Sequence, residues 1–318
     1  MSRAKPSRGL DWKAGAIGNG EWTGVPLRDV LLSLGIKEDD IGKPGYSHVR
    51  FEGLDREPNT TTGYGASIPL DIALDKKRNV LLAWNYNHEP LTKDHGAPLR
   101  VIVPGVVAAR QVKWLGKIAL SSEESESLWQ KKDYKAFPQY QDWDTVNFES
   151  MPAIQDMPVS SGITEPADNK VINVSEGETT VKVKGWAWSG GGRAITRVDV
   201  SPDNGQSWVA AKITAQPVDK SPSLTASFGW TLWEADVPVP LASEYLLAER
   251  RAVAKAVAAR LVLPPGAPPP SSLEPIKMEI AVKAMDSACN TQPESPLPIW
   301  NYRGVVNNSW SRVKVQLQ

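Results

Sequence analysis

The stretch DHGAPLRVIVPGVVAARQVKW, from Asp94 to Trp114, decides the fold of the N-terminal half of the chain. Residues Leu99 to Val107 are too apolar to face water, so they predict a buried strand. The dipeptide Pro104-Gly105 breaks that strand and bends the backbone. The stretch therefore predicts a rigid element with polar residues at both of its ends.

Two donors stand at the start of the expected strand, and two cations follow it. His95 and Arg100 are the donors, and Arg110 and Lys113 lie beyond the break. Cations and donors held in this way suit an anionic ligand rich in hydrogen-bonding groups, such as a pterin phosphate. The alternative from chemistry alone is a histidine that satisfies a turn beside a set of solvated basic residues.

The composition argues against several classes of protein. A chain of 318 residues suffices for two domains with sizeable cores. The formal net charge is +0, from 36 basic and 36 acidic residues, which argues against a general nucleic-acid or membrane-surface binder. One cysteine and three histidines allow no internal disulfide and disfavour a zinc site. No apolar run is long enough to span a bilayer, and the basic start MSRAKPSRG lacks the apolar stretch of a signal peptide.

Residues 9–158 have the pattern of a mixed α/β region. The spacing of apolar residues predicts a helix over Val25 to Gly35, with Leu34 on its apolar face and the glycine as its stop. Ile68 to Leu74 predicts a short helix, and Val80 to Trp84 predicts a strand.

Residues 159–318 have an all-β pattern. Thr180 to Trp188 and Ile195 to Val200 alternate between apolar and polar residues, and Asn204-Gly205 is a strong hairpin signal. Regular short strands of this kind indicate a sandwich of the immunoglobulin type. The small and polar residues from Ser160 to Pro166 are expected to mark the domain boundary.

One segment, Leu241 to Ser272, interrupts the expected sandwich. It is rich in Ala and Arg with helical spacing, and PPGAPPPSS follows. A surface helix on a long loop fits this pattern, since loop insertions cost little. Translated non-coding sequence and a partner-binding helix are the alternatives. With this insertion, the expected fold class is α+β, with domains over 1–158 and 159–318.

Five further motifs follow one another along the chain. They are Phe51–Asp55 (FEGLD), Tyr64–Leu70 (YGASIPL), Asp133–Phe137 (DYKAF), Gly185–Arg193 (GWAWSGGGR) and Ile299–Val305 (IWNYRGV). Together with the stretch from Asp94 to Trp114, they resemble the sulfite oxidase family of molybdopterin-dependent oxidoreductases. The resemblance implies a molybdopterin-binding domain followed by an immunoglobulin-like dimerisation domain.

The resemblance also implies which residues contact the pterin of the molybdenum cofactor. They are Asp55, His95, Arg100, Gln111, Val112 and Lys113. Gln111 departs from the animal members of the family, which resemble His-Val-Lys at 111–113, but an amide still offers an acceptor and two donors.

Tyr134, Arg303 and Trp12 are the substrate-pocket residues that the resemblance implies. The planar, permanently charged fork of Arg303 suits the sulfite oxyanion, although it would have to reach back from the second domain. The phenol of Tyr134 can donate to the same anion and assist proton movement. Without the resemblance, the three would be a salt-bridge arginine, a half-exposed tyrosine and a core tryptophan.

The metal ligand is expected outside these residues. In the family, a cysteine in a Cys-Ala-Gly-Asn-Arg-Arg-like segment binds molybdenum, and that segment would precede Gly9. We therefore expect an N-terminally truncated chain with no metal ligand, and haem only in a separate N-terminal domain. Cys289 lies in an expected turn and is interpreted as an idle thiol. His48 and His88 match no motif.

The implied function is the oxidation of sulfite to sulfate by a homodimer with Mo-molybdopterin. The implied compartment is the mitochondrial intermembrane space, and a cytochrome-type protein is the candidate electron acceptor; no nucleic-acid or membrane partner is expected. The molybdenum portion of a nitrate reductase is one alternative, disfavoured by Asp133-Tyr134-Lys135 and by a chain end soon after Trp310. A non-catalytic dimerising protein is the other, and the absent cysteine favours it.

Overall fold

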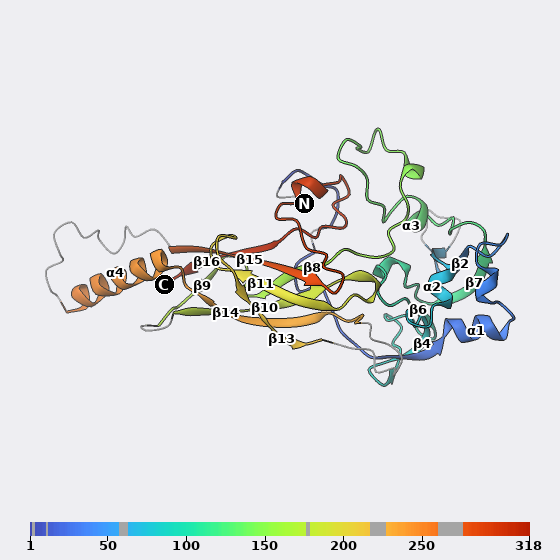
Figure 1. The fold of residues 1–318 in the computed structure, drawn as a ribbon, viewed down its shortest axis with the longest axis horizontal. Coiled ribbons are helices and arrows are strands. Elements are labelled where there is room, and N and C mark those ends of the chain that lie inside the picture. Colours follow the sequence, from blue (N-terminus) through green and yellow to red (C-terminus); the bar gives the residue numbers. More distant parts are fainter. Residues whose placement is uncertain (2–3, 11, 57–62, 176–178, 217–226, 260–275) are drawn as a thin grey trace.

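The chain folds around two large hydrophobic cores at opposite ends of an elongated molecule (Figure 1), and a small third cluster consists of Phe137, Trp300 and Tyr302. This computed structural model describes all residues except 2–3, 11, 57–62, 176–178, 217–226 and 260–275. The first core is built from residues between Leu27 and Val112, and the second from residues between Val159 and Leu317. The α+β fold class is confirmed, since sheets dominate and helices are few.

Two small antiparallel sheets and three short helices surround the first core. The first sheet has the order β1-β4-β5, with β6 also paired to β4, and it consists of β1 (Trp22–Pro26), β4 (Leu81–Tyr86), β5 (Glu89–Pro90) and β6 (Arg100–Ile102). The second has the order β3-β2-β7 and consists of β2 (His48–Arg56), β3 (Gly63–Pro69) and β7 (Leu115–Ser121). The helices are α1 (Leu27–Ser33), α2 (Leu70–Leu74) and α3 (Leu128–Lys131).

The two helices expected in this region are present but shorter than the sequence indicated. Helix α1 buries Leu27 and Leu31, and Gly35 follows it with φ +86°. Leu34 is 72% exposed, so its expected place on the apolar face is wrong, because the helix ends one residue earlier. Ile68 belongs to β3, and only Leu70–Leu74 is helical, because the chain follows the sheet up to Pro69.

The expected strand from Leu99 to Val107 is buried as predicted but is mostly not a strand. Its apolar residues pack into the first core, whereas a strand forms only over Arg100–Ile102, which pairs with β4, and Val106 makes a single isolated bridge to Asp156. The physical reason is at Pro104-Gly105: proline has no N–H to donate, and Gly105 has φ +77°. The chain then turns away from the sheet, so the polar residues after it are held by a loop.

Two sheets packed face to face enclose the second core. One has the order β13-β14-β10-β8 and consists of β8 (Ser160–Glu165), β10 (Thr180–Trp188), β13 (Lys212–Ala215) and β14 (Thr231–Pro238). The other has the order β12-β11-β15-β16-β9 and consists of β9 (Lys170–Ile172), β11 (Ile195–Ser201), β12 (Val209–Ala210), β15 (Ile276–Asp286) and β16 (Ser311–Leu317). All pairs are antiparallel except β16 with β9.

Most of Ser160–Pro166, where the domain boundary is expected, forms a strand of the sandwich. Ser160–Glu165 forms β8, which pairs with β10 at the edge of the sandwich. Glycine suits this strand, because a Cβ on Gly162 would stand 2.8 Å from the indole of Trp186, closer than van der Waals contact allows.

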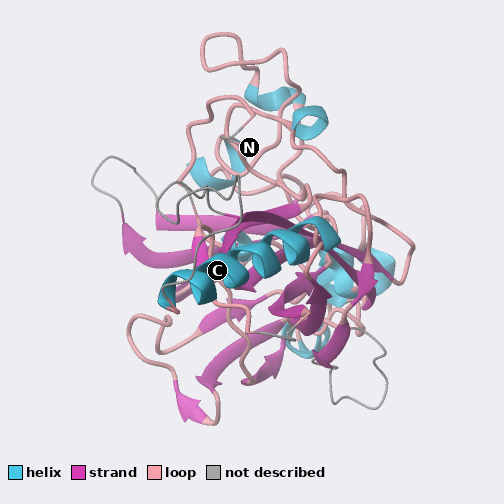
Figure 2. Cartoon of the chain, turned by 90° about the vertical axis from the view of Figure 1, so that its left-hand side faces the viewer, coloured by secondary structure: helices cyan, strands magenta, loops and turns pink. Residues whose placement is uncertain are grey.

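Helix α4 (Leu241–Ala258) lies across one end of the sandwich (Figure 2). The helix was expected, but as a surface element on a loop, and that part of the interpretation is wrong. Leu247 is 3% exposed and belongs to the second core, and Val253 is 5% exposed. The proline-rich remainder of the expected insertion lies outside the described residues. α4 therefore closes part of the second core.

A tight backbone contact joins the region of the first core to the sandwich. The N–H of Gly191 donates to the carbonyl of Gly105 at 2.8 Å, and a Cβ on Gly105 would stand 2.9 Å from that nitrogen. Asp156 accepts from Arg78 at 2.7 Å and lies 3.9 Å from Arg193 of the sandwich. Only glycine permits this approach, which fixes how the sandwich meets the first region.

Candidate active site

Three segments far apart in the sequence converge at the end of β2. The N–H of Leu54 donates to the carbonyl of Trp114 at 2.8 Å, which brings the neighbouring Asp55 and Lys113 close together. Lys113 donates through Nζ to the carbonyl of Asp94 at 2.9 Å, and a Cβ on Gly96 would stand 2.8 Å from the Lys113 Cβ. The segments that carry three of the predicted pterin-contact residues therefore form one surface.

His95 and Arg100 are held together by an aromatic layer. Arg100 donates from Nη1 to the His95 carbonyl at 2.9 Å, and its guanidinium lies 4.8 Å from the ring centre of Trp22. The His95 ring stacks on Tyr86 with centroids 5.6 Å apart, and its Nδ1 lies 2.6 Å from the hydroxyl of Thr92. Burial lowers the pKa of Arg100 to about 10, which leaves it charged at neutral pH.

The side chains of Gln111 and Val112 are less available to a ligand than the resemblance implied. The Val112 side chain is fully buried in the first core, and its carbonyl accepts from the Val101 N–H at 2.8 Å. Gln111 is half-buried, and its amide donates to the Val106 carbonyl at 3.5 Å. Of these two, only Gln111 presents a polar side chain.

Arg303 reaches from the sandwich region to the first region, as the sequence predicted. It forms an ion pair with Asp133, with the two side chains 20% and 17% exposed. Its guanidinium also lies 5.5 Å from the ring centre of Trp143. Next to Asp133, burial raises the pKa of Tyr134, and the Asp133 carboxylate adds to the rise, so the phenol stays protonated.

Trp12 differs from the other two predicted pocket residues. Its side chain is 76% exposed, so the core alternative for it is wrong. The segment before it does lie against the Arg303 backbone, because a Cβ on Gly9 would stand 2.7 Å from the Arg303 carbonyl oxygen.

Tyr64 links the pterin-contact group with the Tyr134 group. Its hydroxyl donates to the Ala109 carbonyl at 2.8 Å, and its ring stacks on Trp129 with centroids 5.5 Å apart. Burial raises the pKa of Tyr64 most, and Tyr134, Asp133 and Asp55 contribute electrostatically. Tyr64 therefore contacts the turn that precedes Gln111 and the ring of Trp129, which lies 6.4 Å from the Tyr134 ring.

The donor set fits a pterin with an anionic tail. Among the described residues, ten buried side-chain polar atoms have no hydrogen-bond partner, and three of them, Asp55 Oδ1, Arg100 Nε and Arg303 Nε, belong to predicted site residues. A buried polar atom left unpaired costs about 1–3 kcal/mol, so such atoms point to a ligand. One acceptor and one cationic donor match the amino and phosphate groups of a pterin, and the second cation suits a small oxyanion.

Metal ligands are not gathered at this site. Among the described residues, no cluster of three or more His, Cys, Asp or Glu could hold a metal ion. Cys289 is exposed in a turn that follows β15, with φ +61°.

Sequence reasoning placed Arg110 wrongly and missed Tyr64. Arg110 was grouped with the ligand-facing cations, but it is completely buried and bonded to main-chain carbonyls. Tyr64 stood in a quoted motif without a role. Its spacing ahead of a buried run was the available signal, but its carbonyl partner is invisible in a sequence.

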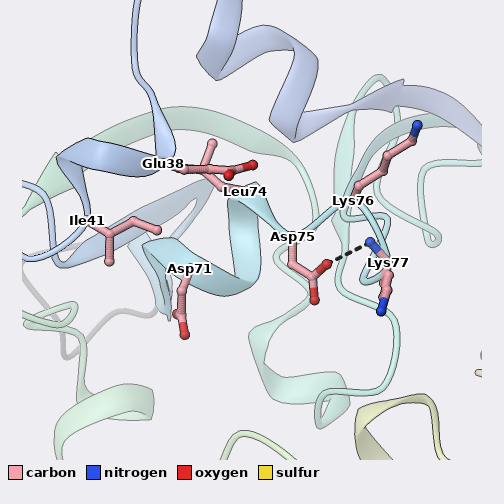
Figure 3. Close-up of a pocket in the computed structure, with 7 residues that line it drawn as sticks. All are labelled: Glu38, Ile41, Asp71, Leu74, Asp75, Lys76 and Lys77. Carbon is pink, nitrogen blue, oxygen red and sulfur yellow. Dashed lines mark hydrogen bonds between the residues drawn. The ribbon is translucent and has the colours of Figure 1, made fainter.

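Another hollow lies beside α2, away from these residues. Figure 3 shows Asp71 and Asp75 at its wall, with the Lys77 N–H donating to Asp75 at 2.8 Å. None of the predicted site residues lines it, and its carboxylates and lysines face open solvent.

Within the described residues, no helix is long and apolar enough to cross a membrane.

Comparisons with known proteins agree with this geometry. Residues 1–129 match the family model of the oxidoreductase molybdopterin binding domain, and residues 151–268 and 270–318 match that of the Mo-co oxidoreductase dimerisation domain. The chain is 44% identical over 317 residues to mitochondrial sulfite oxidase of Mus musculus. This alignment covers 100% of this chain and 50% of that protein. It is 38% identical over 322 residues to sulfite oxidase of Arabidopsis thaliana, covering 100% of this chain and 72% of that protein.

More distant matches include a nitrate reductase and a solved structure. Inducible nitrate reductase [NADH] 2 of Glycine max is 34% identical over 325 residues, covering 100% of this chain and 32% of that protein. The sulfane dehydrogenase SoxCD from Paracoccus pantotrophus superposes with a TM-score of 0.62 at 25% identity, covering 93% of this chain and 60% of that one. The chain spans about half the length of the mitochondrial animal relatives that it matches.

Proposed function

The chain belongs to the sulfite oxidase family of molybdopterin-binding oxidoreductases, and from this premise we propose that it forms the pterin and substrate sites of an enzyme that oxidises sulfite to sulfate. One observation carries the proposal: Arg303 of the sandwich region pairs with Asp133, the neighbour of Tyr134. We also propose that residues 1–158 and 159–318 act as the two domains.

Each side chain has a defined task in this proposal. Asp55 accepts from the pterin, and Arg100 and Lys113 bind its anionic tail, while the cofactor supplies a molybdenum centre that accepts two electrons when bound. Arg303 binds the sulfite oxyanion through its charged fork. Tyr134, which burial keeps protonated, donates a hydrogen bond to the same anion.

Cofactor binding is the first test. The isolated chain should bind molybdopterin weakly, because its one cysteine, Cys289, is exposed in a distant turn. Asp55→Ala and Arg100→Met should weaken that binding further, measured by pterin fluorescence after release. Asp71→Ala, in the hollow beside α2, is the matched control and should change nothing. Equal binding by all variants would contradict the assignment of these residues.

Turnover is the second test, and it uses the chain joined behind a cysteine-bearing segment from a sulfite oxidase relative. The loaded fusion should reduce an acceptor in the presence of sulfite. Turnover with nitrate and a reduced dye instead would support the nitrate reductase alternative. Pterin binding without either reaction would support the non-catalytic alternative.

Assembly and location follow from the same family. We propose a homodimer formed through the second domain, since that domain matches a dimerisation family. A two-fold interface buries the same patch from both subunits. We further propose a mitochondrial location in the intermembrane space and a cytochrome-type electron acceptor, because several relatives are mitochondrial sulfite oxidases. Sedimentation equilibrium of the chain at micromolar concentration tests the dimer, and a monomer would contradict it.

A further inference from the structure

Arg110 is a completely buried cation whose hydrogen bonds go to three main-chain carbonyls, two in the stretch 129–134 and one at Ile154. It ends the 3₁₀ turn Ala108–Arg110, which follows the break after β6. Its Nε donates to the Ile154 carbonyl at 3.0 Å and its Nη1 to the Trp129 carbonyl at 3.0 Å. Its Nη2 donates to the Tyr134 carbonyl at 3.4 Å.

A buried guanidinium costs free energy, so its place in the fold requires a structural reason. Burying a guanidinium costs free energy, and carbonyl dipoles offset less of that cost than a carboxylate would. No neutral side chain carries donors that reach three carbonyls at once, whereas arginine has five N–H groups in a rigid fork. The cation at this position holds the stretch 129–134 and the segment of Ile154 to the turn that carries Arg110.

The segments held by Arg110 are those of the proposed active site. Gln111 and Lys113 follow Arg110 directly, so the turn that carries the clamp also carries pterin-contact residues. Tyr134 and its neighbour Asp133, the partner of Arg303, lie on one of the clamped segments. The Ile154 N–H also donates to the Tyr134 carbonyl at 3.0 Å, so two donors fix that peptide group.

We propose that Arg110 is the positioning residue that sets Tyr134 relative to the pterin-contact segment, an inference that rests on the proposed function. Arg110 touches neither ligand. It acts through the Tyr134 main chain, with the stacked rings of Tyr64 and Trp129 beside it. Loss of the clamp lets the phenol move away from the anion, and misplacement by about 1 Å can cost on the order of 100-fold in rate.

The first experiment measures the position of Tyr134 without any cofactor. The chain is labelled with fluorotyrosine, and the Tyr134 resonance is assigned with Tyr134→Phe. Arg110→Lys, which keeps the charge but reaches fewer carbonyls, should shift and broaden that resonance and speed hydrogen exchange at the Ile154 amide about tenfold or more. Arg28→Lys is the matched control, since Arg28 also donates to a main-chain carbonyl, that of Leu74, and it should leave both signals unchanged.

A folded Arg110→Lys protein with an unmoved Tyr134 resonance overturns the proposal. Tyr64→Phe covers the case in which Arg110→Lys does not fold, because it only removes the bond to Ala109 in the turn that carries Arg110. The Tyr64→Phe substitution should shift the Tyr134 resonance, but by less than the shift expected for Arg110→Lys. An unmoved resonance there overturns the proposal as well.

The second experiment is a double-mutant cycle on the cofactor-loaded fusion. Arg110→Lys should lower kcat about tenfold with Tyr134 present, and less than about twofold in a Tyr134→Phe background. Equal losses in both backgrounds would show that Arg110 does not act through Tyr134. Absence of sulfite turnover in the unsubstituted fusion would count against the proposed function, while the fluorine measurement would still decide the role of Arg110.

Discussion

Three cations fix main-chain segments around the candidate active site, whereas two carboxylates fix turns of the sandwich. At the site, cations donate to main-chain carbonyls: Arg110 to three of them, Lys113 to Asp94, and Lys135 to Phe148 at 2.7 Å. In the sandwich, carboxylates accept from main-chain N–H groups. Asp286 binds those of 288 and 290 at 2.9 and 3.0 Å, and Asp203 binds those of 206 and 207.

The difference follows from how much of each backbone is paired in sheets. β10 and β14 pair in unbroken register over eight residues, from Thr180 opposite Pro238 to Ala187 opposite Thr231. In the first region, β2 and β3 lose register after Glu52, and β6 has only three residues. Unpaired carbonyls there require donors, and cations supply strong ones. A region shaped to hold an anionic ligand thus uses cations both for its loops and for its ligand.

The largest effect should come from the sandwich core, which holds itself without a ligand. Trp233, on β14, is 1% exposed and is among the largest fully buried side chains. Trp233→Ala should lower the free energy of unfolding by about 3–5 kcal/mol, through lost burial and a residual cavity. Denaturant unfolding followed by circular dichroism measures this change.

The matched control for Trp233→Ala is Leu232→Ala, at the preceding residue of β14. Leu232 points outward and is 39% exposed, so Leu232→Ala should cost less than about 1 kcal/mol. If both variants lost the same stability, the sandwich would not depend on its inner face, and the contrast between the two regions would fail.

Arg303 is the cation that the sandwich region contributes to the site, so it tests whether the contrast extends across the junction. Arg303→Met should weaken binding of sulfite to the loaded fusion by about 2 kcal/mol, seen as a raised KM. This is the lower end of what losing one partner of a charged pair costs, because the side chain is partly exposed. Arg312→Met, at a distant pair with Glu294, is the control. An unchanged KM would remove Arg303 from the substrate site.

The sequence predicted the sandwich better than the first region, for a physical reason. Alternation over Thr180–Trp188 and the signal at Asn204-Gly205 are local, and both are confirmed; the turn residues have φ +57° and +102°. The Leu99–Val107 strand was wrong because apolar character shows burial and not pairing. The role of Ser160–Glu165 as a strand depends on a partner across the sheet, which composition does not reveal.

The candidate site was predicted mainly through resemblance, and its roles stay predictions. The structure brings Asp55, Lys113 and His95 together and pairs Arg303 with Asp133. The fixing of loops by Arg110 could not be predicted, because its partners are carbonyls that every residue carries. Side-chain chemistry is readable in a sequence, whereas main-chain acceptors become visible only in the fold.

The dependence of stability on acid pH should differ between turns that are fixed by carboxylates and loops that are fixed by cations. Burial alone would raise the pKa of Asp286, but hydrogen bonds from Asn290 and Ser189 outweigh it, and the net shift is downward. A carboxyl with a lowered pKa stabilises the fold above its unfolded pKa of about 3.9, and this stabilisation is lost as pH falls through the folded value. Asp286→Asn should therefore lose about 1–2 kcal/mol at pH 7 and show less acid dependence below pH 4.

Denaturation at pH 7, 5 and 3 measures the dependence. Lys135→Met serves as the comparison from the site loops, since Lys135 is a cation that donates to the Phe148 carbonyl and not a carboxylate. That variant should keep the acid dependence of the unsubstituted protein. Identical acid profiles for Asp286→Asn and the parent would contradict the role given to carboxylates in the sandwich turns.

The smallest effect is expected on the outer face of α4, which tests how the sandwich end is used. Tyr245 is 74% exposed, whereas Leu247, two residues on, belongs to the second core. Tyr245→Ala should change the free energy of unfolding by less than about 0.5 kcal/mol, because surface changes away from special features are nearly neutral. The dimer dissociation constant should also stay the same, since α4 contributes to the proposed homodimer by closing the core and not by contact. Sedimentation equilibrium and denaturant unfolding of the same sample measure both quantities. A tenfold weaker dimer with unchanged stability would place the outer face of α4 in the subunit interface, and the sandwich end would then be an assembly surface.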